Sequence, residues 1–299
     1  MYALEIKNLS LSFLMYDKGI KKKALQVISD LNITLKPGEI HAIAGSSGSG
    51  KSLLAHAILG ILPRNARVEG EMNWFGQPLT SKLQKKLRGD QLALVPQSVA
   101  YLDPLMRVGK QICKDKSKAL RTMDKYGLDQ RAAKMYPFEL SGGMARRALV
   151  STAAATNARV IIADEPTPGL SPELAETAMT RFRELAEQGS AILLITHDLD
   201  LALRYADRIS VFYAGTTLET ARASDFQSED LLRHPYSKAL WRAMPQNNFE
   251  PTPGTQPYAG NLPTGCVFAD RCPRRTEACG KRPGSRILRE GEVCCHYAD

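Results

Sequence analysis

The chain has 299 residues, long enough for one large domain with an appendage or for two small domains. Hydrophobic residues make up 43% and charged residues 24%, a composition that excludes a disordered or collagen-like protein. The net charge is +9, and the segment from Lys82 to Arg147 carries 15 basic and 6 acidic residues. This local excess indicates a solvated helical surface or proximity to anionic lipid, and we expect no nucleic-acid partner.

The sequence predicts neither a membrane span nor a secretory signal. No uninterrupted apolar run approaches the ~20 residues that a helix needs to cross a bilayer. Residues 1–7 lack the basic start, apolar middle and small-residue cleavage site of a signal peptide. We therefore expect a cytoplasmic protein.

Apolar residues that alternate with polar ones predict a half-buried strand at the start of the chain, through Leu4, Ile6, Leu9, Leu11 and Phe13. The basic stretch 18–23, which contains a glycine, is expected to form a surface loop. The apolar run 40–44 then predicts a strand that leads into a glycine-rich loop. Helical spacing follows from Ser52, with apolar residues at Leu53, Leu54, Ala57, Ile58 and Ile61.

The glycine-rich loop fits the phosphate-binding pattern of two glycines five residues apart, followed by Lys and Ser. Glycines let consecutive backbone N–H groups turn inward around phosphate oxygens, and the following helix adds its positive N-terminal end. We expect Lys51 to pair with the β- and γ-phosphates of ATP, and the Ser52 hydroxyl to bind Mg²⁺. The loop comprises Gly45, Ser46, Ser47, Gly48, Ser49, Gly50, Lys51 and Ser52.

The later half of the chain repeats the order of strand, helix and strand. Apolar runs at 160–163 and 191–195 flank an amphipathic stretch that carries Ala178, Met179, Phe182 and Leu185. Strands that alternate with helices predict an α/β fold with a mostly parallel sheet covered on both faces. Between the halves, 99–148 lacks strand-like runs and is expected to form an inserted helical subdomain.

Two carboxylates, Asp164 and Glu165, end the strand over 160–163. At the carboxyl edge of a sheet, Asp164 can hold the magnesium shell and Glu165 can polarise the water that attacks the γ-phosphate. Asp-Glu after an apolar strand is a weak signal alone, and it becomes strong after a phosphate loop at this distance.

Five prolines lie between Pro245 and Pro263 and predict a linker. We therefore expect a nucleotide-binding domain over 1–244, a linker over 245–263 and a cysteine-rich tail over 264–299. Clustered cysteines in a cytosolic protein indicate metal rather than disulfides, although a metal-free tail is an alternative. Four thiolates can hold an iron–sulfur cluster or a tetrahedral zinc. The tail carries Cys266, Cys272, Cys279, Cys294 and Cys295, whereas Cys113 stands alone as an ordinary side chain.

The segment Leu140-Ser141-Gly142-Gly143-Met144 resembles the Leu-Ser-Gly-Gly-Gln signature of ATP-binding-cassette ATPases. The resemblance covers at least Leu4 to Leu240, with every motif in the family's order. It implies a phosphate-loop, RecA-like core with a parallel sheet, an antiparallel β element, the inserted helical subdomain and here a small cysteine-rich extension. A phosphate-loop kinase of small molecules would not explain this signature.

By this resemblance, Gln97 is expected to sense magnesium and the attacking water, and His197 to contact the γ-phosphate. Phe13 matches the aromatic residue that stacks on adenine, with Tyr16 as a competitor. In the family, Ser141, Gly142 and Gly143 of one subunit close over the nucleotide bound to the other.

Two departures from the family pattern bear on the pairing of subunits. Met144 replaces the usual Gln of the signature, and Ser171 stands where the D-loop usually carries Asp. That aspartate helps the two subunits communicate, so its replacement predicts a heterodimer with a second, different ATPase subunit.

Within the family, the resemblance is to subunits of oligopeptide, dipeptide and nickel importers. It rests on Asp103-Pro104, on residues 234–240 and on the cysteine tail. It implies two membrane-spanning permease subunits, an extracytoplasmic binding protein, a position at the cytoplasmic face of the membrane, and import of peptides, nickel or metal chelates. In this subfamily the cysteine pattern resembles one that carries a four-iron four-sulfur cluster, with zinc as the alternative. The expected ligands are Cys266, Cys272, Cys279 and Cys295, with Cys294 a spare. A soluble cassette ATPase that acts as a nucleotide-dependent clamp is the competing function.

Overall fold

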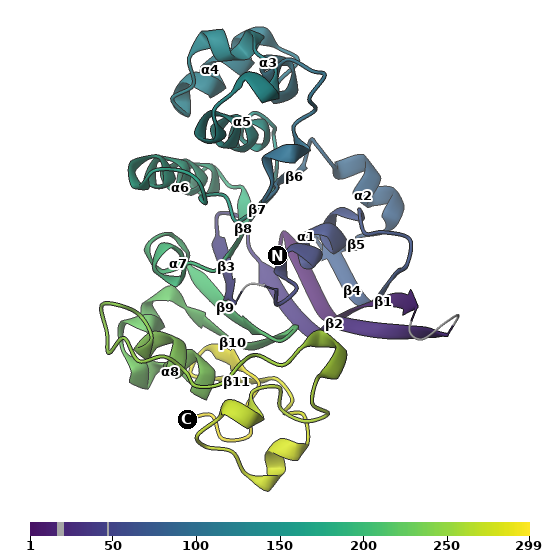
Figure 1. Cartoon of the computed structure of the whole chain (residues 1–299), viewed down its shortest axis with the longest axis vertical. Coiled ribbons are helices and arrows are strands. Elements are labelled where there is room, and N and C mark those ends of the chain that lie inside the picture. The colour runs from purple at the N-terminus through teal and green to yellow at the C-terminus, as the bar shows by residue number, and fades with distance from the viewer. Residues whose placement is uncertain (17–20, 47) are drawn as a thin grey trace.

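The computed structural model describes residues 1–16, 21–46 and 48–299, folded as two sheets with flanking helices (Figure 1). The strands are β1 Leu4–Tyr16, β2 Lys22–Leu35, β3 Ile40–Gly45, β4 Ala66–Trp74, β5 Gln77–Pro78, β6 Leu92–Val95, β7 Val160–Asp164, β8 Ala191–Thr196, β9 Arg208–Tyr213, β10 Thr216–Arg222, β11 Arg286–Leu288 and β12 Gly291–Val293. The α-helices are α1 Lys51–Leu59, α2 Ser81–Leu87, α3 Val108–Ile112, α4 Lys116–Lys125, α5 Gly142–Ala154, α6 Pro172–Glu187, α7 Leu199–Tyr205 and α8 Pro235–Arg242.

The larger sheet has the strand order β11-β12-β10-β9-β3-β8-β7-β6, and the five strands from β9 to β6 are parallel. Alternate residues of each parallel strand face different hydrophobic clusters. On β8, Ile192 and Leu194 join the cluster beneath α6 and α7, whereas Leu193 and Ile195 join the cluster that includes α1 and the smaller sheet. Burial on both faces explains why these strands are mostly apolar. The predicted α/β core is confirmed.

The smaller sheet is antiparallel, with the order β2-β1-β4-β5, as the family resemblance implied. The step from Ile6 to Leu9 breaks strict alternation because the register shifts there, and Asn8 takes a left-handed φ of 50°. The prediction of a loop over 18–23 is wrong at its C-terminal end. Lys22 and Lys23 begin β2 and pair with Tyr16 and Met15, where the exposed strand end keeps both ammonium groups in water. Residues 18–20 lie outside the described part of the chain.

Helices α3, α4 and α5 form a separate helical part, at the top of Figure 1. Their own small core includes Val108, Met123 and Leu149, and no strand lies between β6 and β7 in this described stretch. Helix α5 runs on to Ala154, beyond the predicted end of the insertion. Among the residues that the structure describes, we find no helix with the length and apolar character needed to cross a membrane.

The C-terminal tail is joined to the main sheet. Strand β12 pairs with β10, and Cys266, Phe268 and Cys279 are buried in the cluster under α6 and α7. A fully buried ion pair adds to this junction: Arg233 is 2% and Glu219 0% exposed, with Nη1 and Oε1 3.2 Å apart. Arg233 also donates from Nε to the Leu288 carbonyl at 2.6 Å, so one guanidinium links β10 to the tail.

We expect Arg233→Ala to lower the free energy of unfolding by about 3–5 kcal/mol, because it leaves the Glu219 carboxylate buried without a counter-charge. Urea unfolding followed by fluorescence measures the loss. The control is Arg222→Ala, which breaks an exposed ion pair with Glu290 and should cost under about 1 kcal/mol. Equal losses in the two variants would contradict the importance of burial at this junction.

Candidate functional site

The glycine-rich loop leaves β3 and turns directly into α1, as predicted. Gly45 lies so close to β9 that a Cβ atom there would stand 2.2 Å from the Phe212 carbonyl oxygen. Gly50, the last residue before α1, has a φ of 99°, which glycine adopts without strain. Ser47 lies outside the described residues. The loop therefore requires glycine at position 45 because β9 lies so close, and at position 50 because of the positive φ.

The Lys51 side chain is folded over this loop and is 5% exposed. Its Nζ donates to the carbonyl oxygens of Gly45 and Ser46, at 2.8 Å each. Burial lowers the pKa of Lys51, while the nearby charges of Glu165 and Asp164 act in the opposite direction. A phosphate group beside Nζ would compensate the desolvation of the ammonium, so the loop and the lysine suit a polyanion.

Asp164 ends β7 with a carboxylate that is 3% exposed. Burial raises its pKa, opposed by a hydrogen bond with the Ser52 side chain. Its Oδ1 has no hydrogen-bond partner within the described residues. An unpartnered carboxylate oxygen next to a hydroxyl is an oxygen donor set that fits Mg²⁺.

Glu165 stands between Gln97 and His197. Gln97 donates from Nε2 to Glu165 Oε2 at 2.9 Å, and His197 Nδ1 lies 3.1 Å from Oε1. Glu165 takes a left-handed φ of 46°, an uncommon conformation for a side chain of this size. Three chain segments that are far apart in the sequence thus meet at the carboxyl ends of β6, β7 and β8.

A pocket of about 240 Å³ lies over this arrangement. Its lining does not include the signature residues Ser141, Gly142 and Gly143. Ser141 instead is the N-cap residue just before α5, where its hydroxyl accepts from Met144 N, and Gly143 lies near the Gly169 carbonyl. The pocket is lined by Gly48, Gly50, Lys51, Ser52, Leu53, Gln97 and Glu165.

The two candidates for adenine stacking lie on β1. Phe13 is partly buried against the cluster that includes α1. Tyr16 is 68% exposed, and Lys22 Nζ lies 5.4 Å from the centre of its ring. Neither lines the pocket over Lys51.

The structure adds two residues that the sequence analysis missed. Arg146 on α5 is buried against the backbone after β6 and β7. Gln256, in the proline-rich stretch, accepts a hydrogen bond of 2.5 Å from Ser46 of the phosphate loop. Neither had a detectable signal, because an arginine in a basic segment and a glutamine among prolines both resemble solvated surface.

Four of the five tail cysteines line one small cavity, together with His234 and His296. Burial raises the pKa of Cys266, Cys272 and Cys295. Within the described residues, however, no group of three or more His, Cys, Asp and Glu side chains is arranged to hold a metal ion. The shared cavity is lined by Cys266, Cys272, Cys279 and Cys295.

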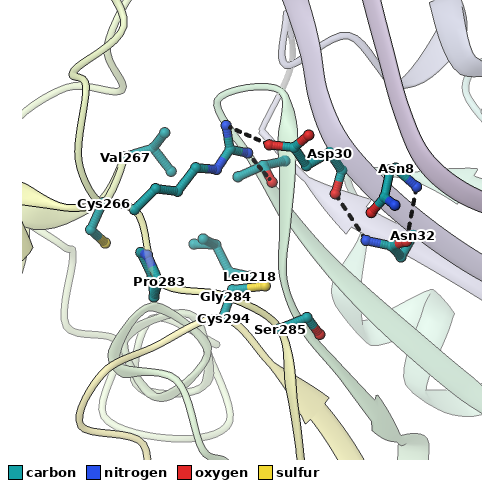
Figure 2. A pocket seen from close by; sticks show the side chains of 12 residues that line it. Asn8, Asp30, Asn32, Leu218, Cys266, Val267, Pro283, Gly284, Ser285 and Cys294 are labelled. Atoms are coloured by element: carbon teal, nitrogen blue, oxygen red, sulfur yellow. Dashed lines mark hydrogen bonds and ion pairs between the residues drawn. The ribbon is translucent and has the colours of Figure 1, made fainter. Parts of the chain in front are cut away.

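Cys294 faces a different cavity, between the tail and the smaller sheet. Figure 2 shows it with Leu218 and Ser285, across from Asp30 and Asn32 of the smaller sheet. Burial raises the pKa of the Cys294 thiol to about 11. Cys294 does not line the cavity that the other four cysteines share, whereas Cys266 lines both cavities.

We expect Lys51→Met to abolish the stabilisation that MgATP confers, since the variant lacks the cation facing the phosphates. In the parent chain, MgATP at about 100 times its Kd should add ~2.7 kcal/mol to the free energy of unfolding. Without nucleotide, the variant should be at least as stable as the parent, because a buried charge is removed. Thermal unfolding with and without MgATP measures both effects. Lys36→Met, at an exposed lysine, serves as the control, and an undiminished shift in Lys51→Met would contradict the assignment.

Comparison with known proteins supports the same assignment. The ABC transporter family model matches residues 28–168. The model of the oligopeptide/dipeptide transporter C-terminal region matches residues 218–279. A dimeric post-hydrolysis structure of the ATP-binding cassette MJ0796, bound to ADP and phosphate, superposes with a TM-score of 0.66 at 25% identity, covering 74% of this chain and 98% of that one.

Two curated relatives extend the similarity over nearly the whole chain. The oligopeptide transport ATP-binding protein OppD of Salmonella typhimurium is 34% identical, over 97% of this chain and 92% of its own. The dipeptide transport ATP-binding protein DppD of Haemophilus influenzae is 32% identical, over 99% of this chain and 96% of its own. The chain therefore belongs to the ATPase subunits of ABC transporters, in the oligopeptide/dipeptide subfamily.

Proposed function

We propose that this chain powers the import of peptides as one of two ATPase subunits beneath a pair of permease subunits, at the cytoplasmic face of the membrane. Membership of the family makes the chain an ATPase that hydrolyses ATP to drive transport. The observation that carries the assignment of this site is the convergence of Gln97, Glu165 and His197 beside the pocket over Lys51.

The proposed chemistry follows from these positions. Lys51 and the loop amides bind the β- and γ-phosphates, while Ser52 and Asp164 hold Mg²⁺, which neutralises charge on the phosphate oxygens. Glu165 accepts a hydrogen bond from the attacking water and orients it toward the γ-phosphorus. Gln97 and His197 bracket the same carboxylate, so they fix its direction in the site.

We propose peptides rather than nickel or metal chelates as cargo. The two relatives compared above are named for oligopeptide and dipeptide transport. A peptide importer also requires an extracytoplasmic binding protein, which selects the cargo before it reaches the permeases.

We further propose that the partner ATPase is a different chain. Ser171 stands at the N-cap position of α6, without a capping hydrogen bond from its side chain, where the family carries an aspartate between subunits. Gly143 lies near Gly169 within this subunit, so the signature and the D-loop segment form one surface for the partner. Two unlike subunits would give the two composite ATP sites different activities.

The test of the proposed function is ATPase activity of the chain alone and after co-expression with candidate permeases and a second cassette. We expect strong stimulation in the assembled complex and peptide uptake that depends on it. High activity that is indifferent to these partners would instead support the soluble clamp.

In that complex, Glu165→Gln should leave ATP affinity within about two-fold and abolish turnover, because the amide cannot accept the proton of the attacking water. Binding of a fluorescent ATP analogue and phosphate release measure the two effects. The partner cassette is inactivated in the same way, and persistent hydrolysis would show that another group is the base.

For the tail, we propose residues 264–299 as a metal-binding extension after a linker over 245–263, with the nucleotide-binding domain over 1–244. The shared cavity of Cys266, Cys272, Cys279 and Cys295 supports a four-iron four-sulfur cluster, with zinc as the alternative. Their side chains are not preformed as a ligand group, so the proposal requires the tail to close around the metal.

Cys272→Ser should remove iron, acid-labile sulfide and absorbance in the blue region from protein purified without oxygen, since it deletes one of four thiolate ligands. If zinc is bound instead, the variant should lose zinc and show no colour change. Cys113→Ser, in the helical part, is the control and should retain the metal. An unchanged metal content in Cys272→Ser, or no metal in the parent chain, would overturn the proposal.

A further inference from the structure

Arg146 lies on the first part of α5, shortly after the signature glycines, and is 3% exposed. Its guanidinium donates to three backbone carbonyls outside its own helix. Nη1 reaches the oxygens of Pro96 at 3.1 Å and Gln97 at 2.5 Å, and Nε reaches that of Pro166 at 3.1 Å. One side chain therefore connects the signature helix to two separate segments of the ATP site.

These two segments carry the groups that face the reaction. Pro96 and Gln97 follow β6, and Pro166 directly follows Glu165 at the end of β7. The Gln97 side chain in turn donates to Glu165 at 2.9 Å. Arg146, Gln97 and Glu165 thus form a closed set of contacts, in which Arg146 holds the backbone and Gln97 contacts the carboxylate.

Stability alone does not account for a guanidinium at this place. Burial of the charge is costly, and Nη2 has no partner among the described residues. A buried charge is weak evidence for a purely stabilising role, because whole buried ion pairs can often be replaced by apolar side chains without loss of stability. The charges of Asp164 and Glu165 favour the cation, and they belong to the ATP site.

We infer that Arg146 is a positioning residue for ATP hydrolysis: it sets Gln97 against Glu165 and ties this arrangement to the signature helix of the same subunit. Movement of α5 toward the partner subunit is then transmitted to Gln97 through the hydrogen bonds that the planar Arg146 guanidinium donates. The inference rests on the proposed role of Gln97 and Glu165 in hydrolysis, and it adds a residue that acts through them.

The first test compares Arg146→Met and Arg146→Lys in the assembled complex. Arg146→Met should lower kcat by about 10- to 100-fold, with KM for ATP within about three-fold, because Gln97 loses its alignment. The melting temperature should fall as well, because three backbone carbonyls lose their donor. Arg146→Lys should recover only part of kcat, since an ammonium cannot bond both segments in one plane.

The matched control is Arg183→Met. Arg183 also joins a helix to the sheet, from Nη2 to the Gly38 carbonyl at 2.8 Å and from Nη1 to Asp207 at 2.9 Å, before β3 and β9 begin. It should leave kcat within about two-fold. A kcat of Arg146→Met within about two-fold of the parent value, measured well below the melting temperature of the variant, would overturn the inference.

The decisive readout is a double-mutant cycle with Gln97→Ala, which keeps the backbone carbonyl. If Arg146 acts through the Gln97 side chain, Arg146→Met should cost no further kcat in the Gln97→Ala background. If the double variant instead lost kcat by the product of the two single-variant factors, the inference would be overturned.

The same double-mutant cycle can be measured on the isolated chain, where the readout is the factor by which Mg²⁺ tightens ATP binding. The two single variants should reduce this factor equally, and the double variant should reduce it no further. This binding cycle decides the role of Arg146 even where the complex is inactive. Inactivity of the parent complex would count against the proposed function instead.

Discussion

The parallel register of β3, β8, β7 and β6 is the constraint on which the site depends. Ala44 pairs with Thr196, Asp164 with Ile195, and Val95 with Ala163, so the four strands end at nearly the same level. The phosphate loop, Gln97, Glu165 and His197 all follow within two residues of a strand end. A shift of one residue in any strand would turn its side chains to the opposite face and separate these groups. Each face of the sheet packs on its own hydrophobic cluster, so a shifted strand would have to repack both clusters.

The charged side chains Lys51, Arg146 and Asp164 at this edge of the sheet are buried, and burial affects them more than pairing with one another does. Lys51 and Arg146 have pKa values lowered by desolvation, and Asp164 has a raised pKa for the same reason. Each group is therefore less well solvated than in water and incompletely compensated by its neighbours. A bound triphosphate with Mg²⁺ supplies charges of both signs, which explains how a site with strained Glu165 geometry can gain stability on binding.

The motifs with fixed spacing could be predicted from the sequence because each is local. Gly45 to Ser52 are eight consecutive residues, and Asp164 and Glu165 are neighbours at one strand end. The contacts of Arg146 could not be predicted, since they join residues separated by 20 to 50 positions in the sequence and depend on how α5 packs on the sheet. The pairing of β12 with β10 was missed for the same reason, and the bulge after Ile6 required the observed register. The choice of Cys295 over Cys294 as the fourth ligand came only from the family pattern, and it stays a prediction.

Strand β9 connects the phosphate loop to the cysteine cavity. The Phe212 carbonyl lies against Gly45, and the next residue, Tyr213, packs its ring 5.5 Å from that of Phe268, which lines the cavity. A second contact joins Ser46 to Gln256 in the stretch before the tail. Any change in the packing of the tail therefore reaches the first residues of the phosphate loop through direct contacts. These contacts are steric and hydrogen-bonded, and they tie the position of the first phosphate-loop residues to the packing of the tail and of the stretch before it.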